Sequence, residues 1–472
     1  MNGKLGAFKI VTLTLLMPGL AYGGSFIFSD GDIFNASTPA DIVTHAIGYE
    51  PKAASPPSSF SIKVCIVPGT TNEAEMVIPV QNIVDRYNLL IPVFPNIRFG
   101  DLSDFGNIDF ESVAVHEMGH CNGLGHTNAA SESGLPSGEI ESTKARGGAN
   151  AVLNVDAGTD TFYGSPDDSR GDDVNLHYFE IGVNNPFLLP DIVDSSTYSR
   201  DVTDLPGGDI FAANADRQVA ASVFNVLSKD CKTTVSLTDR CIEAVMQQGS
   251  GNAETQRTLA ADDVTTLMYA RTGVDRVAGN ADDYAPTLVY AGVSNASDCD
   301  LTVAFDDDET GFAVCKSSVS SLNWNDSESA LALSSSNIYF NTGSNWEFST
   351  TRIPLPVADT ASVVAGGTVT SVNGGSIRLT DNDTDQNAAV VCSDVAADCV
   401  VSSQTFGGSE HGTVTLNSNG TFSYTNTNTS ATTDRFVYEV CVGSDKSACS
   451  HQYVNITIMP GNDNFLFEDS FE

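Results

Sequence analysis

The chain has 472 residues, more than one ordinary domain contains, so about two or three domains are expected. Its hydrophobic content of 41% is enough to form folded cores and excludes wholesale disorder. The formal net charge of −38 argues against a nucleic-acid partner, because phosphate binding needs a basic surface. This charge suits an exported protein, or one that binds calcium through carboxylates.

The N-terminal residues have the pattern of a secretory signal peptide. Lys4 and Lys9 accompany a short apolar run at residues 10–17, and the Ala-Tyr-Gly triplet at 21–23 fits a cleavage site. We therefore expect residues 1–23 to be a signal peptide and the mature protein to be secreted or held at the cell surface. A buried N-terminal strand is the alternative. No segment approaches the length needed to span a bilayer, so no membrane span is expected.

Ten cysteines fit an oxidising compartment, and eight of them lie close together in pairs. Close spacing predicts local disulfides, although the sequence does not fix their connectivity. The close pairs are Cys231 with Cys241, Cys299 with Cys315, Cys392 with Cys399, and Cys441 with Cys449. None has the Cys-x-x-Cys spacing of a structural zinc site.

The first predicted elements are a strand and a helix. The alternating, β-branched run at residues 61–67 indicates a strand. Pro79 suits the first turn of the helix that follows. The apolar stripe of this helix consists of Val80, Ile83, Val84 and Tyr87.

A second helix, beginning at Phe110 with Asp109 as its N-cap, carries the chemistry. His116 and His120 are four residues apart, so their rings project from one face and can bind one zinc ion. Glu117 points into the same cleft, where it is placed to take a proton from a metal-bound water.

Gly123 explains how a third histidine can reach the metal. A glycine can adopt a left-handed conformation that ends the helix and turns the chain back. We therefore predict His126 as the third ligand. Three histidines leave the fourth position to water, as a catalytic zinc requires. A structural zinc site, or a helix with coincidental histidines, is the alternative.

The pattern His-Glu-x-x-His-x-x-Gly-x-x-His from His116 to His126 resembles the signature of metzincin zinc peptidases, and its flanks are similar to the matrixin branch. The resemblance implies an α+β catalytic domain that hydrolyses protein or peptide substrates, with Glu117 as general base. It also implies a methionine turn beneath the metal. Met246 is the best match for that turn, and residues 259–264 are similar to the last matrixin helix.

The sequence departs from the matrixin pattern in three ways. Met246 lies much farther from His126 than in matrixins, so an insertion at about residues 128–240 is expected to loop out and form part of the substrate cleft. The segment between the first helix and Asp109 is short, which predicts a reduced upper sheet. His177, inside the insertion, is a rival third ligand.

Cys65 permits two interpretations. The run at residues 63–69 resembles the Cys-x-x-Pro core of the matrixin pro-segment latch, in which a cysteine caps the zinc. However, only about forty residues separate Cys65 from the predicted signal cleavage site, and the run also indicates a strand. A disulfide between Cys65 and Cys121 is therefore preferred.

Two functional hypotheses follow. In the first, the chain is an active zinc endopeptidase in which Glu117 accepts a proton from the zinc-bound water and delivers it to the leaving amine. In the second, it is a catalytically inactive exported surface or adhesion protein that keeps only the metzincin fold. The presence of Glu117 favours the first, because a structural site does not need this carboxylate.

Two acidic turns, at residues 158–168 and 273–283, share the same offsets of glycine and aspartate. Three carboxylates on a glycine-kinked loop offer hard oxygen ligands, which suits calcium, although the spacing is not that of an EF-hand. The candidate calcium ligands are Asp160, Asp167, Asp168, Asp275, Asp282 and Asp283. Solvated acidic turns are the alternative.

Beyond a linker at 354–356, recurring strand-like runs separated by turn residues predict an all-β sandwich. Residues 357–459 resemble bacterial cadherin-like or immunoglobulin-like repeats of exported proteins. The matching motifs begin at Leu379, His411, Asn419 and Asp434. The resemblance implies a bacterial source and a spacer, adhesion unit or substrate anchor, with extracellular matrix or a cell-surface ligand as candidate partners.

The expected fold class is therefore an α+β metzincin-like catalytic domain with a large insertion, followed by an all-β sandwich. The predicted organisation is a signal peptide (1–23), a zinc peptidase domain (24–285), a small β-rich segment (286–353), a cadherin-like or Ig-like sandwich (354–459) and a C-terminal tail (460–472).

Overall fold

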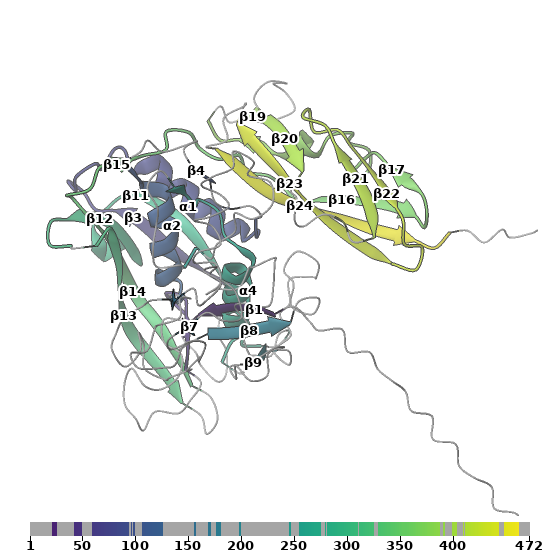
Figure 1. Ribbon diagram of the computed structural model, residues 1–472. Helices are drawn as coiled ribbons and strands as arrows, with labels where there is room; N and C mark the ends of the chain where they lie inside the picture. The colour runs from purple at the N-terminus through teal and green to yellow at the C-terminus, as the bar shows by residue number, and fades with distance from the viewer. Residues whose placement is uncertain are drawn as a thin grey trace, which may run out of the picture.

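The described part of the chain is largely β-structure with few helices. The computed structural model describes residues 21–25, 42–49, 59–93, 96, 98–99, 106–125, 155–156, 169–170, 176–180, 198–199, 245–246, 254–274, 279, 281–309, 311–324, 329–387, 390–391, 399–403, 409, 411–442 and 448–461. Figure 1 shows two bodies, an N-terminal domain that carries the helices and a C-terminal sandwich.

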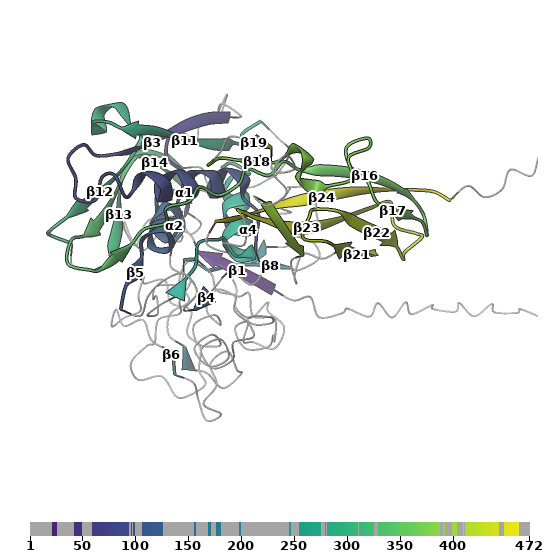
Figure 2. The same ribbon diagram turned by 90° about the horizontal axis from the view of Figure 1, so that it is seen from above.

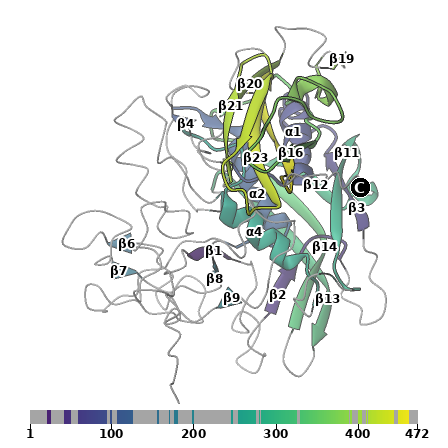
Figure 3. The ribbon, with the colours of Figure 1, turned by 90° about the vertical axis from the view of Figure 1, so that its right-hand side faces the viewer.

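The N-terminal domain is built on a six-stranded mixed sheet. Its strands are β2 (Ile42–His45), β3 (Ser59–Ile66), β11 (Ala285–Val293), β12 (Leu301–Asp306), β13 (Ala313–Trp324) and β14 (Ser329–Asn341). Five strands follow the order β11-β3-β12-β14-β13, and β2 pairs with the first residues of β14. Neighbours are parallel except at the edge, where β13 runs antiparallel to β14. Figure 3 shows β2 beside β13 and β14.

Three helices pack with this sheet around one apolar core. Helix α1 (Val77–Leu89) contacts β11, α2 (Phe110–Cys121) contacts β13 and β14, and α4 (Ala261–Ala270) lies near β2. The Asp109 side chain caps α2 by accepting a hydrogen bond from the Ser112 backbone N–H at 3.0 Å, as predicted. The core includes Val64, Tyr87, Phe110, Val264 and Phe340.

The sheet is completed by strands that come late in the chain. Strands β11 to β14 lie in the segment 286–353 that composition predicts as a separate unit, yet β11 and β12 flank β3 in the same sheet. The expectation of a reduced upper sheet is therefore wrong. Strand pairing depends on matching apolar faces and register, which can join segments far apart in sequence. The segment between the first helix and Asp109 supplies none of the six strands of this sheet.

The disulfides correct two predicted pairings. Cys65 pairs with Cys299 and Cys121 pairs with Cys315, so neither the local Cys299–Cys315 bond nor the Cys65–Cys121 bond forms. The pairings follow from the sheet, because β3 lies beside the residues that lead into β12, and α2 packs on β13. A disulfide also removes Cys65 from the role of a zinc-capping latch.

In the C-terminal sandwich, the local pair Cys441–Cys449 is confirmed. The other two predicted pairs, Cys231 with Cys241 and Cys392 with Cys399, involve residues outside the described part of the chain or side chains that are not described there.

Short strands complete the N-terminal domain. They are β1 (Ala21–Ser25), β4 (Arg98–Phe99), β5 (Ile108–Asp109), β6 (Val155–Asp156), β7 (Ser169–Arg170), β8 (Leu176–Glu180), β9 (Tyr198–Ser199), β10 (Glu254–Thr255) and β15 (Trp346–Glu347), with the 3-10 turn η4 at Ala296–Asp298. Strand β1 pairs with β8 and crosses the expected signal cleavage position. Cleavage there stays a prediction.

The C-terminal module is a β-sandwich, which confirms the predicted all-β architecture. Its elements are β16 (Asp359–Val364), β17 (Thr368–Val369), η5 (Leu379–Asn382), β18 (Thr384–Asp385), β19 (Val390–Val391), β20 (Cys399–Ser403), β21 (Gly412–Leu416), β22 (Phe422–Asn426), β23 (Thr433–Val442) and β24 (Cys449–Met459). One sheet has the order β16-β24-β23-β20 and the other β17-β22-β21. Their facing side chains, including Tyr424, Tyr438 and Ile456, form a second core.

The two bodies are joined by polar contacts with α1. Arg352, which precedes the linker, donates to Asp85 and to Gln386 of the sandwich, at 2.7 and 2.5 Å. Gln386 also donates to Asp85, at 2.7 Å. Figures 1 and 2 show α1 on the side of the N-terminal domain that faces the sandwich. The module is thus docked on the helical side of the first domain.

Within the described residues, none of the helices combines the length and apolarity needed to cross a bilayer.

Two fully buried carboxyl groups make the sandwich sensitive to pH. Burial raises the pKa of Asp359 to about 7 and that of Asp383 to about 8. An acid with a raised pKa binds its proton more tightly in the folded chain, so its contribution to stability is full below pH ~4 and declines up to pH ~8. We expect amide exchange in β23 to accelerate from pH 5 to pH 9 beyond the intrinsic chemical rate. The double variant Asp359→Asn/Asp383→Asn should lose most of this dependence, and an unchanged slope would contradict the assignment.

Candidate metal centre

Helix α2 presents two histidine rings at one site. The ring centroids of His116 and His120 lie 4.7 Å apart, with an interplanar angle of 87°. His116 Nδ1 contacts the Val245 carbonyl oxygen at 2.6 Å, and His120 Nδ1 contacts the Leu124 carbonyl oxygen at 2.8 Å. The four-residue spacing therefore brings the rings together as the sequence predicts.

These hydrogen bonds fix which nitrogen of each ring can bind a metal. A carbonyl oxygen only accepts, so Nδ1 of His116 and of His120 must carry the proton. The lone pair of each neutral imidazole then lies on Nε2. Burial also lowers the pKa of His116, which favours the neutral form that a metal requires. Backbone carbonyls behind ligand histidines commonly play this orienting role.

Glu117, between the two histidines in sequence, is 5% exposed. Its carboxyl group accepts a hydrogen bond from the Cys315 backbone N–H on β13, while Oε2 is buried without a hydrogen-bond partner. Burial raises the pKa of Glu117 to about 8. A buried carboxylate oxygen without a partner is costly, and such groups usually have a functional reason.

Met246 lies against the helix between the two histidines. A Cβ at Gly119 would collide with the Met246 sulfur, so only a glycine permits this approach. Met246 is 1% exposed, and the neighbouring Val245 supplies the carbonyl that holds His116. The residue predicted as the methionine turn is thus in contact with the helix that carries His116 and His120.

Asp263 of α4 holds this turn in place. Its carboxylate accepts from the backbone N–H groups of Val245 and Met246, at 2.8 and 3.4 Å, and from that of Ala260 at 2.9 Å. Burial raises the pKa of Asp263 to about 7. The orientation of His116 therefore depends on a residue of α4 through Val245.

Buried ion pairs fix the first turns of α2. Arg257 pairs with the N-cap Asp109 at 2.5 Å, and Arg86 of α1 pairs with Glu111 at 3.4 Å. Ser349, a few residues after β15, also donates to Glu111. Removing one partner of such a pair leaves a buried charge uncompensated, so these contacts strongly constrain the helix.

The predicted third ligand, His126, lies outside the described residues, so its place is still a prediction. The chain before it does turn as expected. Gly123 has φ of +100°, and a Cβ there would lie 2.7 Å from the Thr44 carbonyl oxygen. The rival His177 lies in β8, of which only the backbone is described.

The donor set of this site suits zinc. Two neutral imidazoles with Nε2 lone pairs and an adjacent carboxylate oxygen without a partner are the groups expected beside a catalytic Zn²⁺. Elsewhere among the described residues, Glu439, Cys441 and Cys449 bring three ligand atoms together. Those cysteines form a disulfide and offer no thiolate.

The acidic turn at 273–283 is held by its own carboxylates. Asp282 accepts from the Val274 backbone N–H at 2.8 Å, and Asp283 accepts from that of Gly279 at 2.6 Å. These contacts are those of a structural turn. Asp275 and the turn at 158–168 with Asp160, Asp167 and Asp168 lie outside the described residues, so calcium binding stays a prediction.

Sequence reasoning missed two residues that organise the site, Asp263 and Cys315. Asp263 is the third residue of α4, whose N-cap residue, Ala260, makes no side-chain hydrogen bond. An acidic side chain at this position often accepts hydrogen bonds from backbone N–H groups at the start of the helix. That position is a usable signal. Cys315 acts through its backbone N–H, which no sequence pattern reveals.

Comparison with known families covers the C-terminal part of the chain. Residues 352–457 match the family described as the bacterial Ig domain. The C-terminal module is a bacterial Ig-like domain. The match confirms the predicted immunoglobulin-like module and fits an extracellular or surface protein. A search of curated proteins finds no match to the chain.

Solved structures similar to this chain include two cadherin ectodomains. The human desmocollin-1 ectodomain is 12% identical, with a TM-score of 0.18, over 29% of this chain and 24% of that one. Extracellular cadherin domains 1–4 of protocadherin gamma B7 are 12% identical, with a TM-score of 0.17, over 30% and 31%. The chain thus spans about a quarter to a third of these structures. Likeness at this level supports no conclusion about function.

Asp263→Ala should destabilise the chain by about 2–4 kcal/mol, because three buried backbone N–H groups lose their acceptor. Chemical denaturation followed by tryptophan fluorescence measures this change. The control Asp298→Ala removes an exposed aspartate of the same domain and should change stability by less than about 0.5 kcal/mol. Equal effects of the two substitutions would show that Asp263 does not hold the turn.

Proposed function

We propose that this chain is an exported zinc-dependent endopeptidase of the metzincin type, with its catalytic α+β domain followed by the Ig-like module. His116, His120 and His126 would hold the metal and Glu117 would act as general base. The proposal unites the sequence signature with the geometry of α2.

The observation that carries the proposal is the contact of Met246 with Gly119. The sequence resemblance asks for a methionine turn under the metal, and Met246 is far from the histidines along the chain. Nevertheless its sulfur packs against Gly119, on the helical turn that joins His116 and His120. Two histidines without a shared role would not be expected on a helix that packs against such a turn.

The mechanism assigns each described residue a task. When bound, zinc supplies Lewis acidity and lowers the pKa of its water to near 7. Glu117 would accept the proton of the attacking water on its partnerless Oε2 and return it to the leaving amine. The carbonyls of Val245 and Leu124 hold Nδ1 of His116 and His120, which would leave Nε2 of each ring for the metal.

Strand β13 would position the general base. The Cys315 N–H binds the Glu117 carboxyl group and leaves Oε2 to the water. The disulfide from Cys315 to Cys121 ties this strand to the residue that follows His120. Both halves of the site, metal ligands and base, are thus held to the same strand.

The test is Glu117→Gln in the zinc-loaded protein. This substitution keeps the side-chain shape but removes the proton acceptor, so hydrolysis of a fluorogenic peptide or casein should fall about 10²–10⁴-fold while bound zinc is unchanged. Glu75→Gln, at an exposed position before α1, is the matched control and should retain full activity.

The same experiment separates the two functional hypotheses. A wild-type protein that binds zinc stoichiometrically, yet hydrolyses neither casein nor a broad peptide library, would favour an inactive exported surface protein. Full activity of Glu117→Gln would instead refute the role of this residue.

A further inference from the structure

A cavity of about 440 Å³ lies at the seam between the N-terminal domain and the Ig-like module. One wall is formed by the end of α1, the end of α4 and the residues before β11. The other wall is formed by β23 and β24. Cavities of this size at domain interfaces are common sites for small ligands.

Arg271 brings a cation into this cavity, and no counterion for it lies among the described residues. None of the ion pairs or side-chain hydrogen bonds among the described residues involves its guanidinium. Burial lowers the pKa of Arg271, and the group that opposes this effect is the Tyr284 phenol rather than a carboxylate. A partly buried cation without an ion pair is stabilised by an anion that reaches it.

Asp283 offers a complementary acceptor beside it. The Tyr284 backbone N–H donates to the Arg271 carbonyl at 2.9 Å, which places Asp283 next to Arg271 on paired segments. Asp283 Oδ2 accepts from Gly279, but Oδ1 is buried without a hydrogen-bond partner. The two charged side chains line one cavity without pairing with each other.

The remaining walls combine apolar and cationic groups. Leu90, Ile91 and Met268 supply apolar surface. Arg435 faces them from β23, stacked 4.2 Å from the ring of Tyr453 and donating to Asn455. In a chain of net charge −38, a cavity with two arginines and one carboxylate is locally cationic.

We propose that this cavity binds the carboxyl-terminal end of a peptide or an N-acylated amino acid. The α-carboxylate would pair with Arg271, whose planar fork matches it, and the adjacent amide N–H would donate to Asp283 Oδ1. The apolar side chain of the ligand would contact Leu90, Ile91 and Met268. The ligand would then supply a donor to Asp283 Oδ1 and an anion to Arg271.

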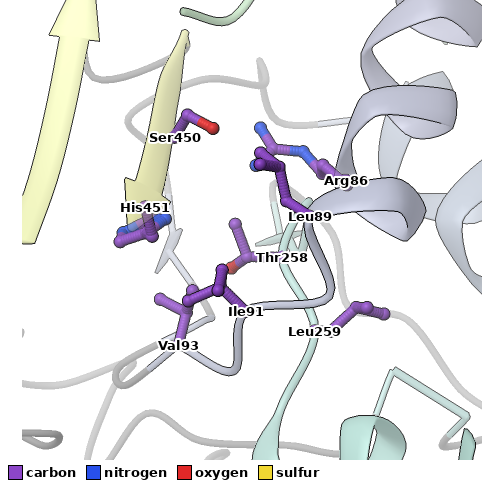
Figure 4. A pocket seen from close by; sticks show the side chains of 8 residues that line it. All are labelled: Arg86, Leu89, Ile91, Val93, Thr258, Leu259, Ser450 and His451. Carbon is purple, nitrogen blue, oxygen red and sulfur yellow. The ribbon is translucent and has the colours of Figure 1, made fainter. Parts of the chain in front are cut away.

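A second cavity between the same two domains is much smaller. It measures about 20 Å³ and lies between Arg86, Leu89 and Ile91 on one side and Ser450 and His451 on the other (Figure 4). Ser450 is 1% exposed and its hydroxyl has no partner. This volume suits one water molecule, whereas the larger cavity has room for a small ligand.

The experiment is calorimetric titration of the full-length protein with N-acetylleucine. We expect saturable binding, and at least about tenfold weaker binding of N-acetylleucinamide, which lacks the carboxylate. Acetate and inorganic phosphate, which lack the apolar body and the N–H, should also bind about tenfold more weakly. No catalytic activity is needed, so the result is independent of the proposed peptidase function.

Arg271→Met should weaken N-acetylleucine binding about tenfold or more, while the ligand-free variant is at least as thermally stable as the wild type, because an unpaired cation is removed. Arg378→Met, at a position in the Ig-like module outside both cavities, is the control and should bind like the wild type. Absence of binding, equal binding of the amide or of phosphate, or unchanged binding by Arg271→Met would overturn the proposal.

Discussion

The candidate site depends on one contact, the packing of the Met246 turn against helix α2 at Gly119. Through this contact the Val245 carbonyl reaches His116 and fixes the nitrogen that can bind metal. Asp263 in turn binds the backbone of the turn and joins α4 to the site. Because these bonds form one buried chain, a change in α4 is expected to reach the candidate metal ligands without touching them.

A second constraint comes from the six-stranded sheet. Some of its strands precede the site residues in the sequence, and others follow them. Strand β3 precedes α2, whereas β11 to β14 follow Met246. Edge strand β13 then supplies the Cys315 N–H that binds Glu117. The Cys121–Cys315 disulfide closes this arrangement across a sequence separation of 194 residues. The N-terminal domain therefore extends at least to Asn341, where β14 ends.

The sequence predicts the local parts of this arrangement well. Histidine spacing on a helix, the Asp109 cap and the turn at Gly123 are governed by local geometry, which a short motif encodes. The sequence does not predict contacts whose partner residue is distant along the chain. The pairing of Cys65 with Cys299 and the role of the Cys315 backbone depend on tertiary placement, which spacing along the chain does not reveal. The Ig-like module was predictable because its alternating strands carry their pattern locally.

The proposed active site requires three imidazoles to bind one zinc ion. X-ray absorption spectroscopy of the zinc-loaded mature protein tests this directly. The account predicts one zinc per chain with three imidazole nitrogens at about 2.0–2.1 Å and one water oxygen, and the loss of one nitrogen in His126→Ala. A protein without stoichiometric zinc, or a His126→Ala spectrum identical to the wild type, would contradict it.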